Sequence, residues 1–197
     1  MVRRRVFLGT LCGLPALTRA FSAPAKSLGD PNAPITIEVF SDFQCPACKT
    51  LYETTLQPLK QYFVFKGKVY LVHRDFPLPM HAYARDAACL ACASEKIGKY
   101  EAVSTALFHQ QQSWAATGKV ADALTGVLTA NELQKVQKLA KDPQTLAEIE
   151  LDIALGKQKA LTQTPTMIMA HKGKTYPVSG VISYSILEKF LNSLLAQ

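Results

Sequence analysis

The chain has 197 residues, of which 48% are hydrophobic and 19% are charged. This composition provides for a buried core and excludes a disordered chain, a collagen-like repeat and a small disulfide-stapled protein. The formal net charge is +7, but four of the positive charges are Arg3, Arg4, Arg5 and Arg19, in the first 20 residues. The other basic residues are interleaved with acids, so we expect no nucleic-acid partner.

Residues 1–23 have the layout of an export signal. Basic residues are followed by an uncharged apolar stretch, residues 6–17, and then by small residues around Ala20 and Ala23. The apolar stretch is shorter than the ~20 residues that a membrane-spanning helix needs. We therefore expect cleavage and a soluble protein that is periplasmic or otherwise exported. The Arg4-Arg5 pair resembles a twin-arginine signal; a general secretory signal and a retained N-terminal anchor are the alternatives.

The next segment predicts a strand, a helix and a second strand. A β-branched and aromatic run indicates a strand over residues 35–40, and apolar residues then recur at helical spacing from Pro46. Pro58 predicts a kink or an end of this helix. After Gly67, residues 69–73 form a second strand. The chain thus changes from strand to helix at Cys45.

Residues 80–161 are rich in Ala, Leu, Gln and Lys, which predicts an all-helical insertion. Asp142-Pro143 is a cap and first-turn pair for its last helix. Strands over residues 166–170 and 174–178 follow, and the tight turn between them makes them antiparallel. A terminal helix covers residues 182–195. Breaks between the inserted helices are expected at four glycines, namely Gly98, Gly118, Gly126 and Gly156.

The order of these elements predicts an α/β fold with a mixed central sheet. We expect residues 24–79 and 162–197 to form the two halves of one domain, with the helical insertion, residues 80–161, between them.

The motif with the clearest chemistry is Cys45-Pro46-Ala47-Cys48. At a helix N-terminus, unpaired backbone N–H groups and the helix dipole favour a thiolate, so we expect a lowered pKa for Cys45. Cys48 lies one turn deeper and is positioned to attack a mixed disulfide on Cys45. The pair is therefore predicted to act as nucleophile and resolving cysteine.

This motif, the distant Thr164-Pro165 before another strand and the helical block between them resemble the DsbA-like thiol:disulfide oxidoreductases of the thioredoxin superfamily. The resemblance covers residues 33–195 and implies a thioredoxin fold. It implies that Pro165 is cis, that it packs beside the cysteine pair, and that the backbone at Thr164 binds an extended client peptide. It requires no cofactor or metal.

The function that the resemblance implies is the introduction of disulfides into unfolded or reduced exported proteins, by exchange with the Cys45-Cys48 disulfide. We expect a monomer that is reoxidised by a membrane quinone-linked oxidase of the DsbB or VKOR type. The alternatives are a disulfide isomerase or reductase of the same fold, and a non-redox module that binds zinc or peptides.

Three residues near the motif invite specific predictions. Glu38 lies in an otherwise apolar strand, so we expect a raised pKa and a proton relay to Cys48, with a solvated position at a sheet edge as the alternative. Asp42 is interpreted as a loop acid whose field opposes ionisation of Cys45. Ala47 stands where strongly oxidising relatives have His, which predicts a milder oxidant.

A second pair, Cys89 and Cys92, lies in an alanine-rich helical stretch. A structural disulfide, buried thiols, and a metal or second redox role are the alternatives. Forty residues between the two Cys pairs disfavour a four-cysteine zinc site. The four histidines show no ligand spacing, so we expect core or surface roles for all of them, including His81.

Overall fold

The computed structural model describes residues 26–197. The predicted export signal over residues 1–23 lies outside the described residues. Within the described part of the chain, every helix is too short or too polar to cross a bilayer.

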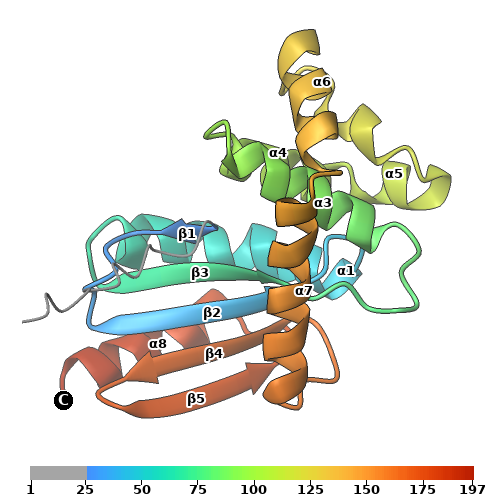
Figure 1. Ribbon diagram of the computed structural model, residues 1–197. Helices are drawn as coiled ribbons and strands as arrows, with labels where there is room; N and C mark the ends of the chain where they lie inside the picture. Colours follow the sequence, from blue (N-terminus) through green and yellow to red (C-terminus); the bar gives the residue numbers. More distant parts are fainter. Residues whose placement is uncertain (1–25) are drawn as a thin grey trace, which may run out of the picture.

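A five-stranded mixed sheet forms the centre of the molecule, with the strand order β1-β3-β2-β4-β5 (Figure 1). β2 (Ile35–Ser41) is parallel to β3 (Val69–Asp75) and antiparallel to β4 (Thr166–His171). β5 (Lys174–Ser179) pairs with β4, as expected for strands joined by a tight turn. The short edge strand β1 (Ser27–Leu28), which the sequence pattern does not reveal, pairs with β3.

The helical segment after β2 is continuous through Pro58. It comprises α1 (Pro46–Leu51), the π-helical η1 (Tyr52–Leu56), α2 (Gln57–Leu59) and the π-helical η2 (Lys60–Val64). Proline has no N–H to donate, and π-helical turns change the hydrogen-bonding register on both sides of it. The helix therefore continues past the residue at which a kink or an end was expected.

A group of helices lies between β3 and β4 in the chain and forms the upper part of Figure 1. One of them, α6 (Ala130–Leu139), begins with a capping box formed by Thr129 and Glu132. The chain is therefore a thioredoxin fold with a helical insertion. The inserted helices are α3 (Ala84–Glu95), α4 (Tyr100–His109), α5 (Gln111–Thr117), the 3₁₀-helical η3 (Val120–Leu124) and α6 (Ala130–Leu139).

The last inserted helix, α7 (Pro143–Gln158), runs from the insertion down across the sheet (Figure 1). The Asp142 side chain accepts a hydrogen bond from the Gln144 N–H, which confirms the predicted cap. The expected break at Gly156 is wrong, because this glycine lies inside α7 and packs against the Phe76 ring.

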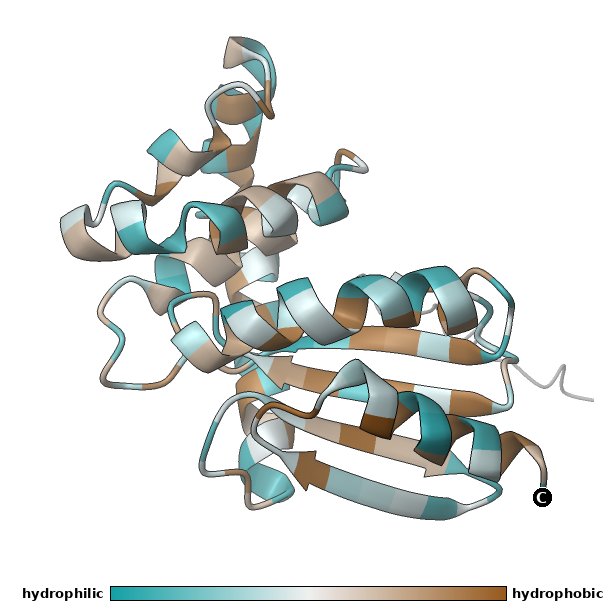
Figure 2. Ribbon diagram, turned by 180° about the vertical axis from the view of Figure 1, so that it is seen from behind, coloured by the Kyte–Doolittle hydropathy of each residue, from teal (hydrophilic) through white to brown (hydrophobic). Residues whose placement is uncertain are grey.

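The two faces of the sheet are covered by different helices. Ile35, Ile37 and Val39 of β2 belong to the main core, which includes residues of α1 and of α8 (Tyr184–Leu195). Both helical segments lie on the face seen in Figure 2. Phe40, whose side chain points the other way, packs with Phe76 and Ile168 in a second cluster under α7. Whether a residue of β2 is odd- or even-numbered thus decides on which face of the sheet its side chain lies.

Candidate active site

Cys45 stands at the junction of β2 and the helix that follows it. Its backbone is extended, with φ −76° and ψ 122°, and Pro46 is the first residue of α1. Proline suits this position because the N–H it lacks would have no partner inside the helix. The Cys45 sulfur therefore lies where the first N–H groups of the helix are unpaired.

The surroundings of Cys45 favour its thiolate. The Cys48 thiol hydrogen-bonds to the Cys45 sulfur and is the main cause that lowers the pKa of Cys45 to about 5. Burial opposes ionisation, while Thr164 and the backbone N–H groups of Cys48 and Ala47 lower the pKa further. Cys45 is only 7% exposed, so access to its sulfur is restricted.

Cys48 has the opposite properties. It is 1% exposed, and burial together with the neighbouring Cys45 raises the pKa of its thiol. The Asp42 N–H donates a hydrogen bond to the Cys48 sulfur over 3.4 Å. The pair is thus asymmetric, with one sulfur prepared to be an anion and the other held as a buried thiol.

The segment before β4 lies beside this pair. The Thr164-Pro165 peptide bond is cis, as the family resemblance implies. The Cys45 Sγ lies 3.5 Å from the Thr164 carbonyl oxygen, across 119 residues of sequence. The structure therefore brings together Cys45, Cys48 and Thr164-Pro165, the residues around which the sequence prediction was built.

The Asp42 side chain is hydrogen-bonded into the turn, whereas the sequence predicted a loop acid that acts only through its field. The residue is 2% exposed, and its carboxylate accepts hydrogen bonds from the N–H groups of Gln44 at 2.7 Å and Leu78 at 2.8 Å. It also accepts one from His81 Nδ1 at 2.7 Å. Aspartate two residues before a backbone donor is typical of turns, so the Gln44 bond could have been expected, but the contact with His81 could not.

Sequence reasoning missed Gln111, which holds the turn from the helical insertion. Its side-chain amide donates to the carbonyl oxygens of Phe43 at 2.7 Å and Cys45 at 2.9 Å. Gln44 accepts a bond from the Tyr83 N–H at 2.8 Å. These contacts tie the cysteine turn to the insertion and to the loop before α3.

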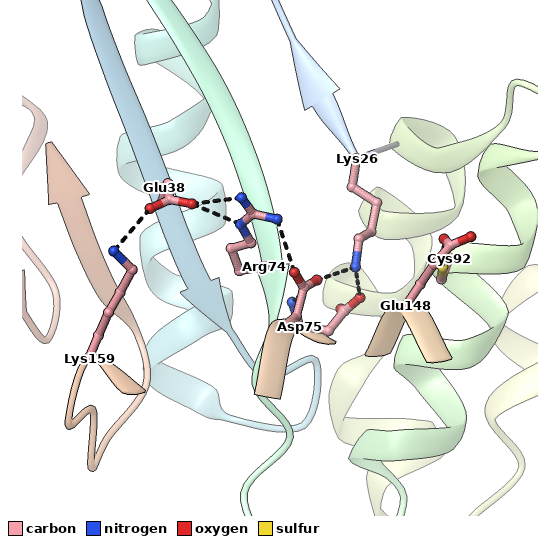
Figure 3. Close-up of polar contacts among 8 residues, drawn as sticks. Lys26, Glu38, Arg74, Asp75, Cys92, Glu148 and Lys159 are labelled. Carbon is pink, nitrogen blue, oxygen red and sulfur yellow. Dashed lines mark hydrogen bonds and ion pairs between the residues drawn. The ribbon is translucent and has the colours of Figure 1, made fainter. Parts of the chain in front are cut away.

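Glu38 lies on the face of β2 opposite to the core that contains Cys48, so the structure does not support the expected relay. It shares its face of β2 with Phe40, under α7, while Cys48 belongs to the core on the other face. Its carboxylate is 2.7 Å from Arg74 and 3.7 Å from Lys159 (Figure 3). A proton relay requires a path to the sulfur, and Glu38 is instead held in ion pairs.

The ion pairs of Glu38 extend into a buried cluster (Figure 3). Arg74 also contacts Asp152 of α7 at 3.1 Å, and the Lys26 ammonium lies between Asp75 and Asp152. Burial alone would lower the pKa of Lys26, but the two aspartates raise it above its usual value. The cluster joins the start of the described chain, β3 and α7.

Cys89 and Cys92 carry free thiols in the structure, as do Cys45 and Cys48. Both lie in α3, and the Cys92 thiol donates to Glu148 of α7 at 3.1 Å (Figure 3). Burial raises the pKa of Cys89 to about 11 and that of Cys92 further. Across residues 26–197, His, Cys, Asp and Glu form no group of three that could hold a metal ion.

The sequence is similar to that of known proteins. The family model described as thioredoxin matches residues 23–192. "Probable disulfide bond formation protein D" of Bacillus cereus is 37% identical over 86 residues, which are 44% of this chain and only 38% of that protein. "Disulfide bond formation protein D" of Bacillus subtilis is 26% identical over 155 residues, covering 74% of this chain and 67% of that protein.

Solved structures of DsbA proteins have the same fold. Pseudomonas aeruginosa DsbA2 has a TM-score of 0.66 at 28% identity and covers 92% of this chain and 96% of its own. Wolbachia pipientis alpha-DsbA1 has a TM-score of 0.72 at 22% identity, with coverages of 86% and 89%. Because the family model spans most of the sequence, from before the first strand to within α8, the chain belongs to the thioredoxin family.

Proposed function

We propose that this chain is a thiol:disulfide oxidoreductase that introduces disulfides into exported proteins. The observation that carries the proposal is the asymmetry of the cysteine pair, in which the pKa of Cys45 is about 5 and that of Cys48 is raised. A sulfur with a low pKa is a good leaving group in disulfide exchange. The relatives named for disulfide bond formation support this reading.

The exchange would run in two steps. A client thiolate attacks the Cys45 sulfur of the Cys45-Cys48 disulfide, and Cys48 leaves and takes up a proton. A second client thiolate then attacks the client sulfur of the mixed disulfide, and Cys45 leaves as a stabilised thiolate. The client loses two electrons and gains a disulfide, and the enzyme gains both electrons as a dithiol.

The surroundings of the pair supply a place for the client. The backbone at Thr164, next to the Cys45 sulfur, would pair with an extended client segment through main-chain hydrogen bonds. Such bonds do not depend on the client's sequence. We propose unfolded or reduced exported proteins as clients and a membrane quinone-linked oxidase, of the DsbB or VKOR type, as the partner that restores the disulfide. The residues described carry the exchange without a cofactor.

The test compares two ribonuclease substrates. The oxidised protein should restore activity to reduced, unfolded ribonuclease, and the Cys45→Ala variant should not. A Cys89→Ala, Cys92→Ala variant is the matched control and should keep the activity. If Cys45→Ala retained it, the proposal would fail in favour of a module without redox chemistry.

Preferential action of the reduced protein on scrambled ribonuclease would instead assign an isomerase. The state in the cell distinguishes the two, because an oxidase rests with Cys45 and Cys48 oxidised. A thiol-specific mass tag reads that state directly.

A further inference from the structure

Asp42 links the cysteine turn to the loop of residues 76–83. One carboxylate oxygen accepts from Gln44 inside the turn, and the other accepts from the Leu78 N–H and from His81 in the loop. The Asp42 side chain has no exposed surface, so no solvent competes for these bonds. The carboxylate thus links the cysteine turn to the loop of residues 76–83, in which its partners lie 36 and 39 residues away in sequence.

The main chain of the same residue touches both cysteines. The Asp42 N–H donates to the Cys48 sulfur at 3.4 Å, and its carbonyl accepts from the Cys45 N–H at 3.1 Å. The side-chain bonds of Asp42 therefore fix the orientation of the groups that its backbone presents to the reacting pair.

We expect the charge of Asp42 to oppose the charge that forms on Cys45, because its carboxylate is buried and its backbone is hydrogen-bonded to the Cys45 N–H. A buried carboxylate close to a thiolate disfavours it, because like charges repel strongly where water is excluded. His81 is 2.7 Å from the carboxylate, and its side chain is 20% exposed, so it can exchange protons with solvent. With a protonated imidazole the Asp42-His81 pair is neutral, and with a neutral imidazole it carries one negative charge.

Other charged groups face the pair from the neighbouring elements. Cys45 precedes α1 and Cys48 lies within it, and both contact the backbone of Asp42. Asp75, at the end of β3, interacts electrostatically with Asp42. Asp75 is itself paired with Lys26. Among these groups, imidazole is the one whose ordinary titration falls near neutral pH.

We propose that Asp42 and His81 are positioning residues for the exchange, and that protonation of His81 favours the Cys45 thiolate. When His81 gains a proton, the repulsion from Asp42 is neutralised and the reduced enzyme gains stability relative to the disulfide. The protein then becomes a stronger oxidant. This inference rests on the proposed exchange at Cys45 and Cys48.

Proton binding at His81 and thiolate formation at Cys45 are expected to affect each other reciprocally. If a proton on His81 stabilises the thiolate, the thiolate stabilises that proton by the same factor. We expect His81 in the reduced enzyme to bind its proton about threefold more tightly than in the oxidised enzyme. NMR titration of histidine-labelled protein in both redox states measures this. His171, which contacts the Pro34 carbonyl at the far end of β2, is the internal control and should titrate alike in both states.

A variant tests the effect on the reaction. The equilibrium constant with glutathione is measured for the wild type and His81→Gln between about pH 5.5 and pH 7.5. The ratio of the two constants should change by about threefold across this range, with the wild type more oxidising at the acidic end. His109→Gln, at an exposed histidine, should leave the ratio flat.

The outcomes separate this proposal from the one it rests on. If glutathione did not exchange with Cys45 at all, the proposed function would fail. If exchange occurred but His81 titrated identically in the two redox states, or the ratio stayed constant with pH, the role of Asp42 and His81 would be refuted while the function stood.

Discussion

At the scale of single residues, the reactivity of Cys45 depends on a neighbour in its own helical turn. The Cys48 hydrogen bond is the largest cause of the low pKa of Cys45, and burial works against it. The start of the helix alone is therefore not the main source of the low pKa. This order of causes leads to a prediction that separates Cys48 from the helix.

Alkylation of Cys45 by iodoacetamide should reach half its maximal rate at about pH 5 in the reduced wild type. In Cys48→Ala the midpoint should rise by about one to two pH units, because the hydrogen bond to the thiolate is lost while the helix start remains. Mass spectrometry of the modified peptide follows the rate at each pH. An unchanged midpoint in Cys48→Ala would assign the effect to the helix instead.

The same shift sets the pH dependence of the reduced enzyme's stability. The pKa of Cys45 is lower in the folded protein than the ~8.5 of an unfolded cysteine. The Cys45 thiolate therefore stabilises the folded protein fully above about pH 8.5. This stabilisation is lost as the pH falls toward about 5. Acid should thus narrow the difference in stability between the reduced wild type and a Cys45→Ser variant.

We expect Ala47 to influence the reduction potential. It is half-buried between the two cysteines and offers the thiolate no cationic partner. Ala47→His should raise the reduction potential by about 30 mV or more, since each 30 mV corresponds to ~1.4 kcal/mol of added stability in the reduced form. Equilibrium with glutathione measures it. Ala47→Gln, similar in size and uncharged, is the control, and an equal rise there would remove the electrostatic explanation.

At the scale of elements, Gly156 shows how one small residue lets α7 approach the sheet. A Cβ at this position would lie 2.5 Å from Phe76 Cε2 and 2.6 Å from Cδ2, which is closer than real contacts. Glycine inside a helix usually costs ~1 kcal/mol relative to alanine. Here that cost is offset because the missing side chain leaves room for the Phe76 ring to pack against α7.

Gly156→Ala should therefore destabilise the protein by about 1 to 3 kcal/mol, although the same change in an open helix would stabilise it. Urea unfolding measures the change. Phe76→Leu removes the ring, so Gly156→Ala should lower the free energy of unfolding less in that background. The double variant should therefore be more stable than the sum of the two single changes predicts. Strict additivity would show that the helix does not meet Phe76.

The elements show what local pattern can and cannot predict. The runs over residues 35–40 and 166–170 predict strands correctly because β-branched residues carry a signal within six residues. The two-residue β1 is too short to carry one. Alternation along β2 could have placed Glu38 on the face of Phe40, but it does not say which face holds the cysteines. That choice is made by the helix packing.

At the scale of the whole molecule, long-range contacts hold the parts together around the site. Lys26 and Asp152 are 126 residues apart, and Gln111 reaches Cys45 across 66 residues. A motif fixes residues that are close in sequence, such as Cys45 and Cys48. It carries no information about which lysine or glutamine elsewhere completes the structure. This is why the sequence pattern points to the Cys45-Cys48 pair and does not reveal Lys26 or Gln111.

The buried cluster around Lys26 is expected to contribute to the stability of the whole fold. Asp152→Asn removes the charge of a carboxylate that contacts both Lys26 and Arg74. Each of these two cations then has one acidic partner fewer. Breaking a buried pair in this way costs about 3 to 5 kcal/mol, so we expect a fall of that order in the free energy of unfolding. Glu150→Gln is the matched control on α7, because its pair with Arg85 is exposed and should contribute less than ~1 kcal/mol.

The equilibrium with glutathione is a second measurement for Asp152→Asn. Asp152 lies on α7, which covers the face of the sheet that holds Phe40, while the cysteine pair belongs to the core on the other face. Asp152→Asn should therefore lower stability and leave the equilibrium with glutathione within about twofold of the wild type. A large change in that equilibrium would mean that the cluster acts on Cys45 through the end of β3, where Asp75 meets the charge of Asp42.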